Sequence, residues 1–245
     1  MVRRIAILTV VVAAMVGPAA YADPIIWNGL TVGQSYNLTI TEPVTYWGGI
    51  RQFNEMGSNI AVTAAAGYTL PSISVLNVAG VANPFWGVCI DTAEWSASQE
   101  GAILQQGWAN DPYPVGPPVG TAGRLNGTVL NQDSWMHTTY LFSQYNSQMG
   151  AMSTEQKAAF QLATWEVLSG DGALGAGWAD GNFQLQSLNG PNTVAVMNAA
   201  NAYVAAAFDE DYANWSASLA QEAFYFSGVS VSSGGQGPHF QDFLV

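Results

Sequence analysis

The chain has a single cysteine, Cys89, so no disulfide within the chain can hold its fold together. This constraint matters because the N-terminus has the form of an export signal, and exported proteins often depend on disulfides. A mature chain of about 220 residues is nevertheless long enough to bury a sizeable core. We therefore expect a fold that is stabilised by its core, and a lone cysteine that is either reactive or specially used.

The first 22 residues have the three parts of a secretory signal peptide. Arg3 and Arg4 give a positive start, an apolar run covers 5–16, and the sequence ending at Ala22 is an A-x-A cleavage site. The apolar run is too short to span a bilayer comfortably, and no second long one follows. We predict cleavage after Ala22 and an exported mature chain with no transmembrane segment, at the cell surface or outside the cell.

The charge of the mature chain excludes two classes of partner. Its basic side chains are Arg51, Arg124 and Lys157, against 17 acidic residues. Binding to nucleic acid requires a basic surface, and attraction to anionic lipids requires clustered Lys or Arg. We therefore expect neither nucleic acid nor an anionic membrane surface as a partner.

Familiar catalytic and metal-binding motifs are missing. The sequence contains no H-E-x-x-H, no G-x-S-x-G, no Walker A loop and no paired cysteines. His137 and His239 lie far apart in sequence and outside any recognisable triad, so we expect ordinary surface or helix residues. The sequence thus predicts no enzyme, no cofactor and no metal site. A secreted hydrolase remains an alternative without a motif in its favour.

The order of the expected elements predicts the fold class. Hydrophobic patterns predict strands first, then three helices, then strands again, and Ser153 to Gln156 has the form of a capping box. This order favours an α+β fold over alternating βαβ units. We predict one domain over 23–245, an antiparallel β-sandwich or barrel with an inserted helical subdomain. The expected strands are 38–41, 60–63, 73–78, 85–90, 224–231 and 240–245. The expected helices are 133–148, 153–169 and 192–208. Within the domain we expect a β-rich part over 23–130, a helical part over 131–208 and C-terminal strands over 209–245.

Two segments carry unusual side chains for their surroundings. The first is aromatic and apolar and runs from Phe85 through Cys89 to Asp91. The second lies on the expected second helix, where Gln161 and Trp165 are one turn apart and share a face. A glutamine on a partly apolar face needs hydrogen-bond partners when it is buried. Gln161 is therefore an odd choice for a core helix.

These segments resemble the Cys–Gln thioester domains of bacterial surface proteins, which have an aromatic-rich segment before a cysteine and a later Gln-x-Ala-x-Trp helix. Gln161-Leu-Ala-Thr-Trp165 matches the helix motif, and Cys89 precedes it. The stretches 139–145 and 241–245 are similar to thioester-domain-like proteins of bacteria with exosortase (PEP-CTERM) sorting. The sequence departs from the family at three positions: it has Val88 where the family favours an aromatic residue or Leu, Thr164 where Ile is usual, and Phe160 where Thr is often found. No sorting tail follows Val245, which leaves the anchoring mode open.

The resemblance implies a chemistry. Cys89 would attack the side-chain amide of Gln161, expel ammonia and leave an internal thioester. An amine on a target surface would open that bond and stay attached through Gln161, so the protein would be a single-use covalent adhesin, not a turnover enzyme. Trp86, Phe160 and Trp165 are then the candidates for shielding the bond from water. Asp91 and Glu166 are the nearby candidates for proton transfer.

A second interpretation needs no covalent chemistry. Buried cysteines often act as small hydrophobes, and Gln161 could hydrogen-bond a loop. The protein would then be a structural or non-covalent module for carbohydrate or matrix at the cell surface. Its nine Trp and ten Tyr residues include some that could stack on sugars. The two interpretations predict different partners, an amine-bearing surface protein for the first and an extracellular polysaccharide or matrix for the second.

Overall fold

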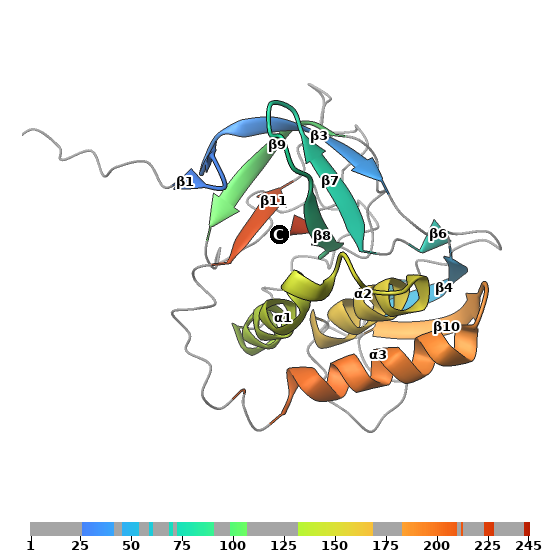
Figure 1. Ribbon diagram of the computed structural model, residues 1–245. Coiled ribbons are helices and arrows are strands. Elements are labelled where there is room, and N and C mark those ends of the chain that lie inside the picture. The colour runs from blue at the N-terminus through green and yellow to red at the C-terminus, as the bar shows by residue number, and fades with distance from the viewer. Residues whose placement is uncertain are drawn as a thin grey trace, which may run out of the picture.

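The computed structural model has an α+β fold of mixed helices and antiparallel sheets (Figure 1). Its helices within the described part of the chain are α1 to α3 and a 3-10 turn. The predicted signal peptide, Asp91 and His239 lie outside the described residues. Those residues are 26–41, 46–53, 59–60, 69–70, 73–90, 99–106, 132–168, 183–209, 212, 223–227 and 243–245.

Six strands are linked by antiparallel pairing into a closed ring, in the order β11-β12-β8-β7-β3-β9. The ring closes because β11 pairs with β9 as well as with β12. Strand β12, near the C-terminus, lies between β11 and β8, so segments distant in sequence complete the ring. The strands are β3 (Ser35–Thr41), β7 (Ser74–Val78), β8 (Phe85–Cys89), β9 (Gln99–Gln106), β11 (Phe224–Ser227) and β12 (Phe243–Leu244).

Burial along these strands shows where the core lies. In β7 the buried residues Ser74, Leu76 and Val78 alternate with more exposed ones, as expected when one face of a strand meets the core. The last three residues of β8, through Cys89, are all buried. Consecutive burial means that both faces of a strand are covered. The second cover at this end of β8 is helix α2 (Thr154–Leu168), which contacts β8 directly.

Helix α2 is central to the helical layer. It packs against α1 (Gln132–Tyr145) and α3 (Thr193–Ala207), and a 3-10 turn, η1 (Asn146–Gln148), follows α1. Every residue from 158 to 165 is buried, which is typical of a helix that is surrounded on all sides. The predicted capping box is confirmed: Ser153 N–H donates to Gln156 Oε1 (2.8 Å), and Gln156 N–H donates to Ser153 Oγ (3.2 Å).

A second antiparallel sheet lies beside the helices. Strand β4 (Tyr46–Phe53) pairs with β10 (Phe183–Asn189), β5 (Asn59–Ile60) and β6 (Thr69–Leu70). Figure 1 shows β10 close to α2 and α3, and the rings of Trp165 and Phe183 lie 6.0 Å apart. Helix α2 therefore lies between β8 of the ring and β10 of this sheet. A two-stranded hairpin, β1 (Ile26–Trp27) and β2 (Leu30–Thr31), begins the described chain.

Several expectations are corrected by these elements. The segment 131–208 is not purely helical, because β10 lies between α2 and α3 and pairs with β4. The sequence reading also missed β4 and β9, and the strand expected at 60–63 is described only to Ile60, the end of β5. His137 is on a helix as expected but is buried: its Nδ1 lies 2.7 Å from the carbonyl oxygen of Ala207, and its ring stacks on Tyr212.

No helix in the described ranges combines the length and the apolar character that a membrane crossing requires.

Candidate functional site

The side chain of Gln161 meets the main chain of Cys89, 72 residues away in sequence. The Cys89 N–H donates to Gln161 Oε1 (2.8 Å), and Gln161 Nε2 donates to the Cys89 carbonyl oxygen (2.7 Å). Both residues are completely buried. The buried amide thus has the partners it needs, and both come from the cysteine that the resemblance pairs with it.

Strand geometry explains why one side chain can make both bonds. The N–H and C=O groups of one strand residue point to the same side of the strand. Cys89 is the last residue of β8, and the register of β8 with β7 reaches Gly87 opposite Ser74. The carboxamide of Gln161 bonds Cys89 as the peptide group of a neighbouring strand would. Helix α2 is thereby joined to the end of β8 by a contact that has the pattern of a sheet.

The helix supports Gln161 from both directions along the chain. The capping box fixes the start of α2 two turns before Gln161. One turn after Phe160, Thr164 is buried, and its Oγ1 donates to the Phe160 carbonyl oxygen (2.9 Å). This back-bond is a common way for a threonine to satisfy its hydroxyl inside a helix. It explains how Thr164 occupies a position that the resembled family gives to Ile.

The three shielding candidates differ in exposure. Phe160 and Trp165 are fully buried, whereas Trp86 on β8 is only partly buried. Lys157 Nζ lies over the Trp86 ring, 4.3 Å from its centroid, in a cation–π contact. The side chains of Phe160 and Trp165 therefore belong to the packed interior around α2. Trp86 instead lies nearer the surface, covered by a cation.

Of the two proton-transfer candidates, Asp91 and Glu166, the structure describes only Glu166. Glu166 is partly buried on α2, five residues after Gln161, and five residues turn an α-helix by about 140° beyond one full turn. Helix geometry therefore directs Glu166 toward a different side of α2 from Gln161.

The described side chains contain no group of three His, Cys, Asp or Glu residues that could hold a metal ion. The clear electrostatic effects lie at other positions. The pKa of Glu155 is lowered, first by a hydrogen bond from Asn192 and then by those from its own backbone and Ser153. The pKa of Tyr203 is raised by burial and by its neighbour Tyr145.

Reasoning from the sequence missed how Gln161 is held. The resemblance points to the cysteine side chain, whereas the amide is bound by the cysteine main chain. The signal that was available is the buried amide itself, which had to find a donor and an acceptor together. A strand end supplies both groups on one residue.

Comparison with known proteins adds no relative. No protein-family model, no curated protein and no solved structure matches this chain. The chemistry that the site can perform is therefore the ground for assigning a function.

Proposed function

We propose that the protein is an exported adhesin in which Cys89 and Gln161 form an internal thioester that reacts once with an amine on a target. The observation that carries this proposal is the pair of hydrogen bonds, 2.8 and 2.7 Å long, between the Gln161 amide and the Cys89 main chain. They hold a nucleophilic residue and an amide together inside a site that is completely buried.

The bonds suit the first chemical step. Cys89 Sγ attacks Gln161 Cδ, so a C–S bond forms and the C–N bond breaks, and the thiol proton leaves with the nitrogen as ammonia. Negative charge develops on Gln161 Oε1 in the tetrahedral intermediate. The Cys89 N–H, which already donates to Oε1, stabilises that charge as an oxyanion-hole donor does. In serine proteases, too, the nucleophile's own N–H takes part in this role.

The direction of the cysteine side chain supports the same step. Hydrogen bonds to a carbonyl oxygen lie near the plane of its amide, so the Gln161 amide is aligned with the main-chain groups of Cys89. Side chains stand roughly perpendicular to that plane in a strand. The Cys89 side chain therefore starts on one side of the plane that the amide shares with the Cys89 main chain, and a carbonyl carbon is attacked from one side of its plane. Rotation about the Cα–Cβ bond of Cys89 would then bring Sγ toward Gln161 Cδ, which is the near-attack geometry that the proposal requires.

The buried surroundings suit the product. A thioester hydrolyses unless water is kept away, and excluding water also strengthens the electrostatic effect of the Cys89 N–H. Phe160 and Trp165, on the same helix as Gln161, are both fully buried. In the second step a target amine attacks Cδ, the C–S bond breaks and the thiol is regenerated. The target is then joined to Gln161 by an amide, so each molecule acts once.

The cellular setting of the proposal follows from the sequence. The export signal and the acidic mature chain favour a protein at the cell surface or in the extracellular matrix, with an amine-bearing surface protein as target. For the fold, the closed ring of six paired strands supports the barrel among the two architectures that the sequence left open. Helices α1 to α3 are inserted between ring strands β9 and β11.

One observation favours a second function. Each hydrogen bond of the Gln161 amide to Cys89 is also what a purely structural connector between α2 and β8 would make. Cys89 would then be a buried small hydrophobe, and the protein a structural or non-covalent surface module. This candidate differs from the first in one measurable property, the presence of the C–S bond.

The test is the intact mass of the purified mature protein beside Cys89→Ala. The proposal expects wild type to be lighter than its sequence by one ammonia, to resist thiol alkylation after unfolding, and to gain one methylamine adduct on Gln161. The Cys89→Ala variant should show the full mass and no adduct. It controls for ammonia loss at the Asn-Gly pairs that begin at Asn28, Asn126 and Asn189.

A wild-type mass equal to the sequence, with a thiol that is fully alkylated after unfolding, would contradict the thioester and favour the structural function. Gln148→Ala is a matched control for the adduct. Gln148 is exposed at the end of η1, so its removal should leave both the mass deficit and the methylamine reaction unchanged.

A further inference from the structure

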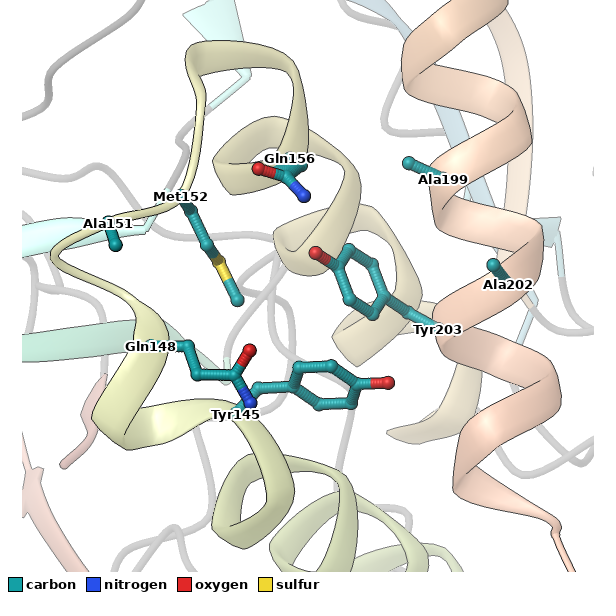
Figure 2. A pocket seen from close by; sticks show the side chains of 8 residues that line it. All are labelled: Tyr145, Gln148, Ala151, Met152, Gln156, Ala199, Ala202 and Tyr203. Carbon is teal, nitrogen blue, oxygen red and sulfur yellow. The ribbon is translucent and has the colours of Figure 1, made fainter.

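A second place in the molecule has the form of a ligand site. A cavity of about 360 Å³ opens where η1, α2 and α3 meet. Its lining comes from Tyr145 at the end of α1, Gln148 in η1, Met152 between η1 and α2, Gln156 in α2, and Tyr203 with two alanines in α3. Figure 2 shows the side chains of Met152, Gln156 and Tyr203 pointing toward a common space, with Tyr145 and Gln148 along its lower edge. Its volume is within the range of about 300 to 1,000 Å³ that is usual for small-molecule pockets.

The walls of this cavity define the class of ligand. Among the described residues that line it, none is acidic or basic, so a charged ligand would lose its hydration without gaining a counter-charge from them. The polar groups are two phenols and two carboxamides, and the remainder of the lining is apolar. This combination suits a small neutral ligand that has both hydroxyl groups and an apolar C–H face.

The aromatic side chains are held in a fixed arrangement. The rings of Tyr145 and Tyr203 are nearly perpendicular, at 81°, with centroids 4.9 Å apart. The buried ring of Phe160 contacts both, at 5.8 Å from Tyr145 and 5.1 Å from Tyr203. The two tyrosines therefore form a supported corner. Because the corner exists before a ligand arrives, binding needs little ordering of these side chains.

Polar groups in the cavity are available to a ligand. Gln156 uses Oε1 to accept from Ser153 N–H, and Gln148 uses Nε2 to donate to the Gln144 carbonyl oxygen. Within the described part of the chain, hydrogen bonds engage neither Gln156 Nε2, nor Gln148 Oε1, nor the hydroxyls of Tyr145 and Tyr203. The cavity thus offers a donor, an acceptor and two hydroxyls that can do both.

We propose that this cavity binds one unit of a neutral saccharide. The C–H face of the sugar ring packs on the partly exposed ring of Tyr145, which the buried ring of Tyr203 supports, and its hydroxyls bond the two carboxamides and the phenols. Among neutral ligands of this size, a sugar ring is one that combines an apolar face with neighbouring hydroxyl groups. The inference does not depend on the thioester, because none of the lining residues is Cys89 or Gln161.

The experiment is a titration of the mature Cys89→Ala protein, in which no thioester can form. Glucose, galactose, N-acetylglucosamine and their oligomers are the neutral probes, and glucuronic and galacturonic acid are the charged counterparts. Binding is followed by saturation-transfer difference NMR and by tyrosine fluorescence. We expect saturable binding of at least one neutral sugar and weaker binding of its uronic acid.

Variants at the cavity identify the site. Tyr203→Phe keeps the ring packing and removes one hydroxyl, so affinity should fall about three- to tenfold, the effect of one hydrogen bond. Gln148→Ala removes an exposed carboxamide and should weaken binding by a similar factor. Gln144→Ala is the matched control: Gln144 is also an exposed glutamine, it does not line the cavity, and its main-chain bond to Gln148 remains.

Three results would overturn the proposal: no saturable binding of any neutral probe, binding only of the uronic acids, or neutral binding that Tyr203→Phe and Gln148→Ala leave unchanged. Binding by wild type alone, and not by Cys89→Ala, would assign the sugar to covalent capture, in which a sugar hydroxyl forms an ester with Gln161 Cδ as the C–S bond breaks and the thiol is regenerated. That result would also overturn the proposal. Loss of the thioester and loss of sugar binding are thus measured separately.

Discussion

At the scale of single residues, the hydrogen bonds of Gln161 distinguish the chemical states of the proposed site. The amide donates through Nε2 and accepts through Oε1. A thioester lacks the nitrogen, so its formation removes the donor to the Cys89 carbonyl oxygen. An amine adduct is again an amide and restores one N–H. The hydrogen that Nε2 donates to Cys89 lies on the same side of the C–N bond as Oε1, and in a trans secondary amide the target's carbon takes that position. The unreacted side chain can therefore make both bonds, whereas the thioester and the trans adduct can keep only the bond to Oε1.

The strength of this pair of bonds can be measured without the covalent chemistry. In a Cys89→Ala background, Gln161→Ala should lower the free energy of unfolding by about 2–4 kcal/mol, because two buried hydrogen bonds and a buried side chain are lost. Urea denaturation followed by circular dichroism measures the change. Gln148→Ala in the same background should change it by less than about 0.5 kcal/mol, as is usual at exposed positions. Equal effects of the two substitutions would contradict the role given to Gln161.

At the scale of elements, the start of α2 is tied to the start of α3. Asn192, just before α3, donates through Nδ2 to Glu155 Oε1 (2.7 Å). This bond is the largest cause of the lowered pKa of Glu155. A carboxyl whose folded-state pKa is lowered stabilises the fold above its unfolded-state pKa. That contribution is lost as the pH falls through the folded-state pKa.

Asn192→Gly tests this link. Asn192 has φ 53°, which glycine adopts without strain, so the substitution removes the bond and leaves the backbone conformation allowed. The pKa of Glu155 should rise toward its ordinary value, as measured by an NMR pH titration of the side chain. The stability difference from wild type should shrink as the pH falls below the folded-state pKa of Glu155. A stability difference that does not vary with pH would show that the substitution acts through the backbone alone.

Strand β9 of the ring contains a bulge opposite β3. Between the pairs Tyr36–Ala102 and Leu38–Gln99 the register shifts, and Gly101 in the longer segment has φ 80°. Its N–H donates to Asn37 Oδ1 (3.2 Å). No neighbouring atom lies within 4 Å of a Cβ added at this glycine, so a side chain there meets backbone strain and not a clash.

Gly101→Ala should therefore destabilise the protein by about 1–2 kcal/mol, the strain of holding a non-glycine residue at positive φ. Thermal unfolding gives the change. Gly101→Asn is the variant for comparison. Asparagine tolerates this backbone region better than alanine does, so this variant should lose less stability. An alanine variant as stable as wild type would show that the bulge rearranges easily.

The elements that the sequence predicted well are those with local signals. Helix α2 was found because its capping box and its apolar spacing lie within the helix itself. Strands β4 and β10 were missed because each depends on the other. Strand β4 contains Gly48-Gly49, and glycine is depleted inside strands, while β10 breaks its alternation at a register shift after Leu185. Pairing between strands so distant in sequence leaves little mark on either one alone.

The candidate site, too, could be predicted from the sequence only where its signal is local. The resemblance pointed to Cys89 and Gln161 together, and the structure brings them into contact. The use of the Cys89 main chain could not be read from the sequence, because it depends on where β8 ends and on how α2 lies across it. Likewise, the tyrosine corner needs α3 to lie beside the end of α1, which no local pattern indicates.

At the scale of the whole molecule, the proposed thioester would be a cross-link between the ring and the helical layer. It would close a loop of 72 residues between β8 and α2. By the chain-entropy model for disulfides, a cross-link that closes a loop of this size stabilises by about 4 kcal/mol. The protein before reaction should therefore resist unfolding more than the protein after it.

Treatment with methylamine tests this consequence. The treated wild type should unfold at lower urea concentration than the untreated wild type, because the cross-link has been opened. Cys89→Ala, treated in the same way, should not change. A wild-type midpoint that methylamine leaves unaltered, in a sample whose adduct is verified by mass, would show that the cross-link contributes no stability.

Because Cys89 and Gln161 are completely buried, the rate of the proposed reaction also depends on how often the site opens. A lysine on a folded target cannot reach a residue that has no exposed surface, so attack must wait for α2 and the end of β8 to separate briefly. The fraction of time spent open then multiplies the intrinsic reactivity, for water as well as for amines. A tightly closed interface would give a bond that survives long storage and reacts slowly, and a looser one would give the opposite. Substitutions that alter only the packing between α2 and β8 would change how long the thioester lasts before it reacts.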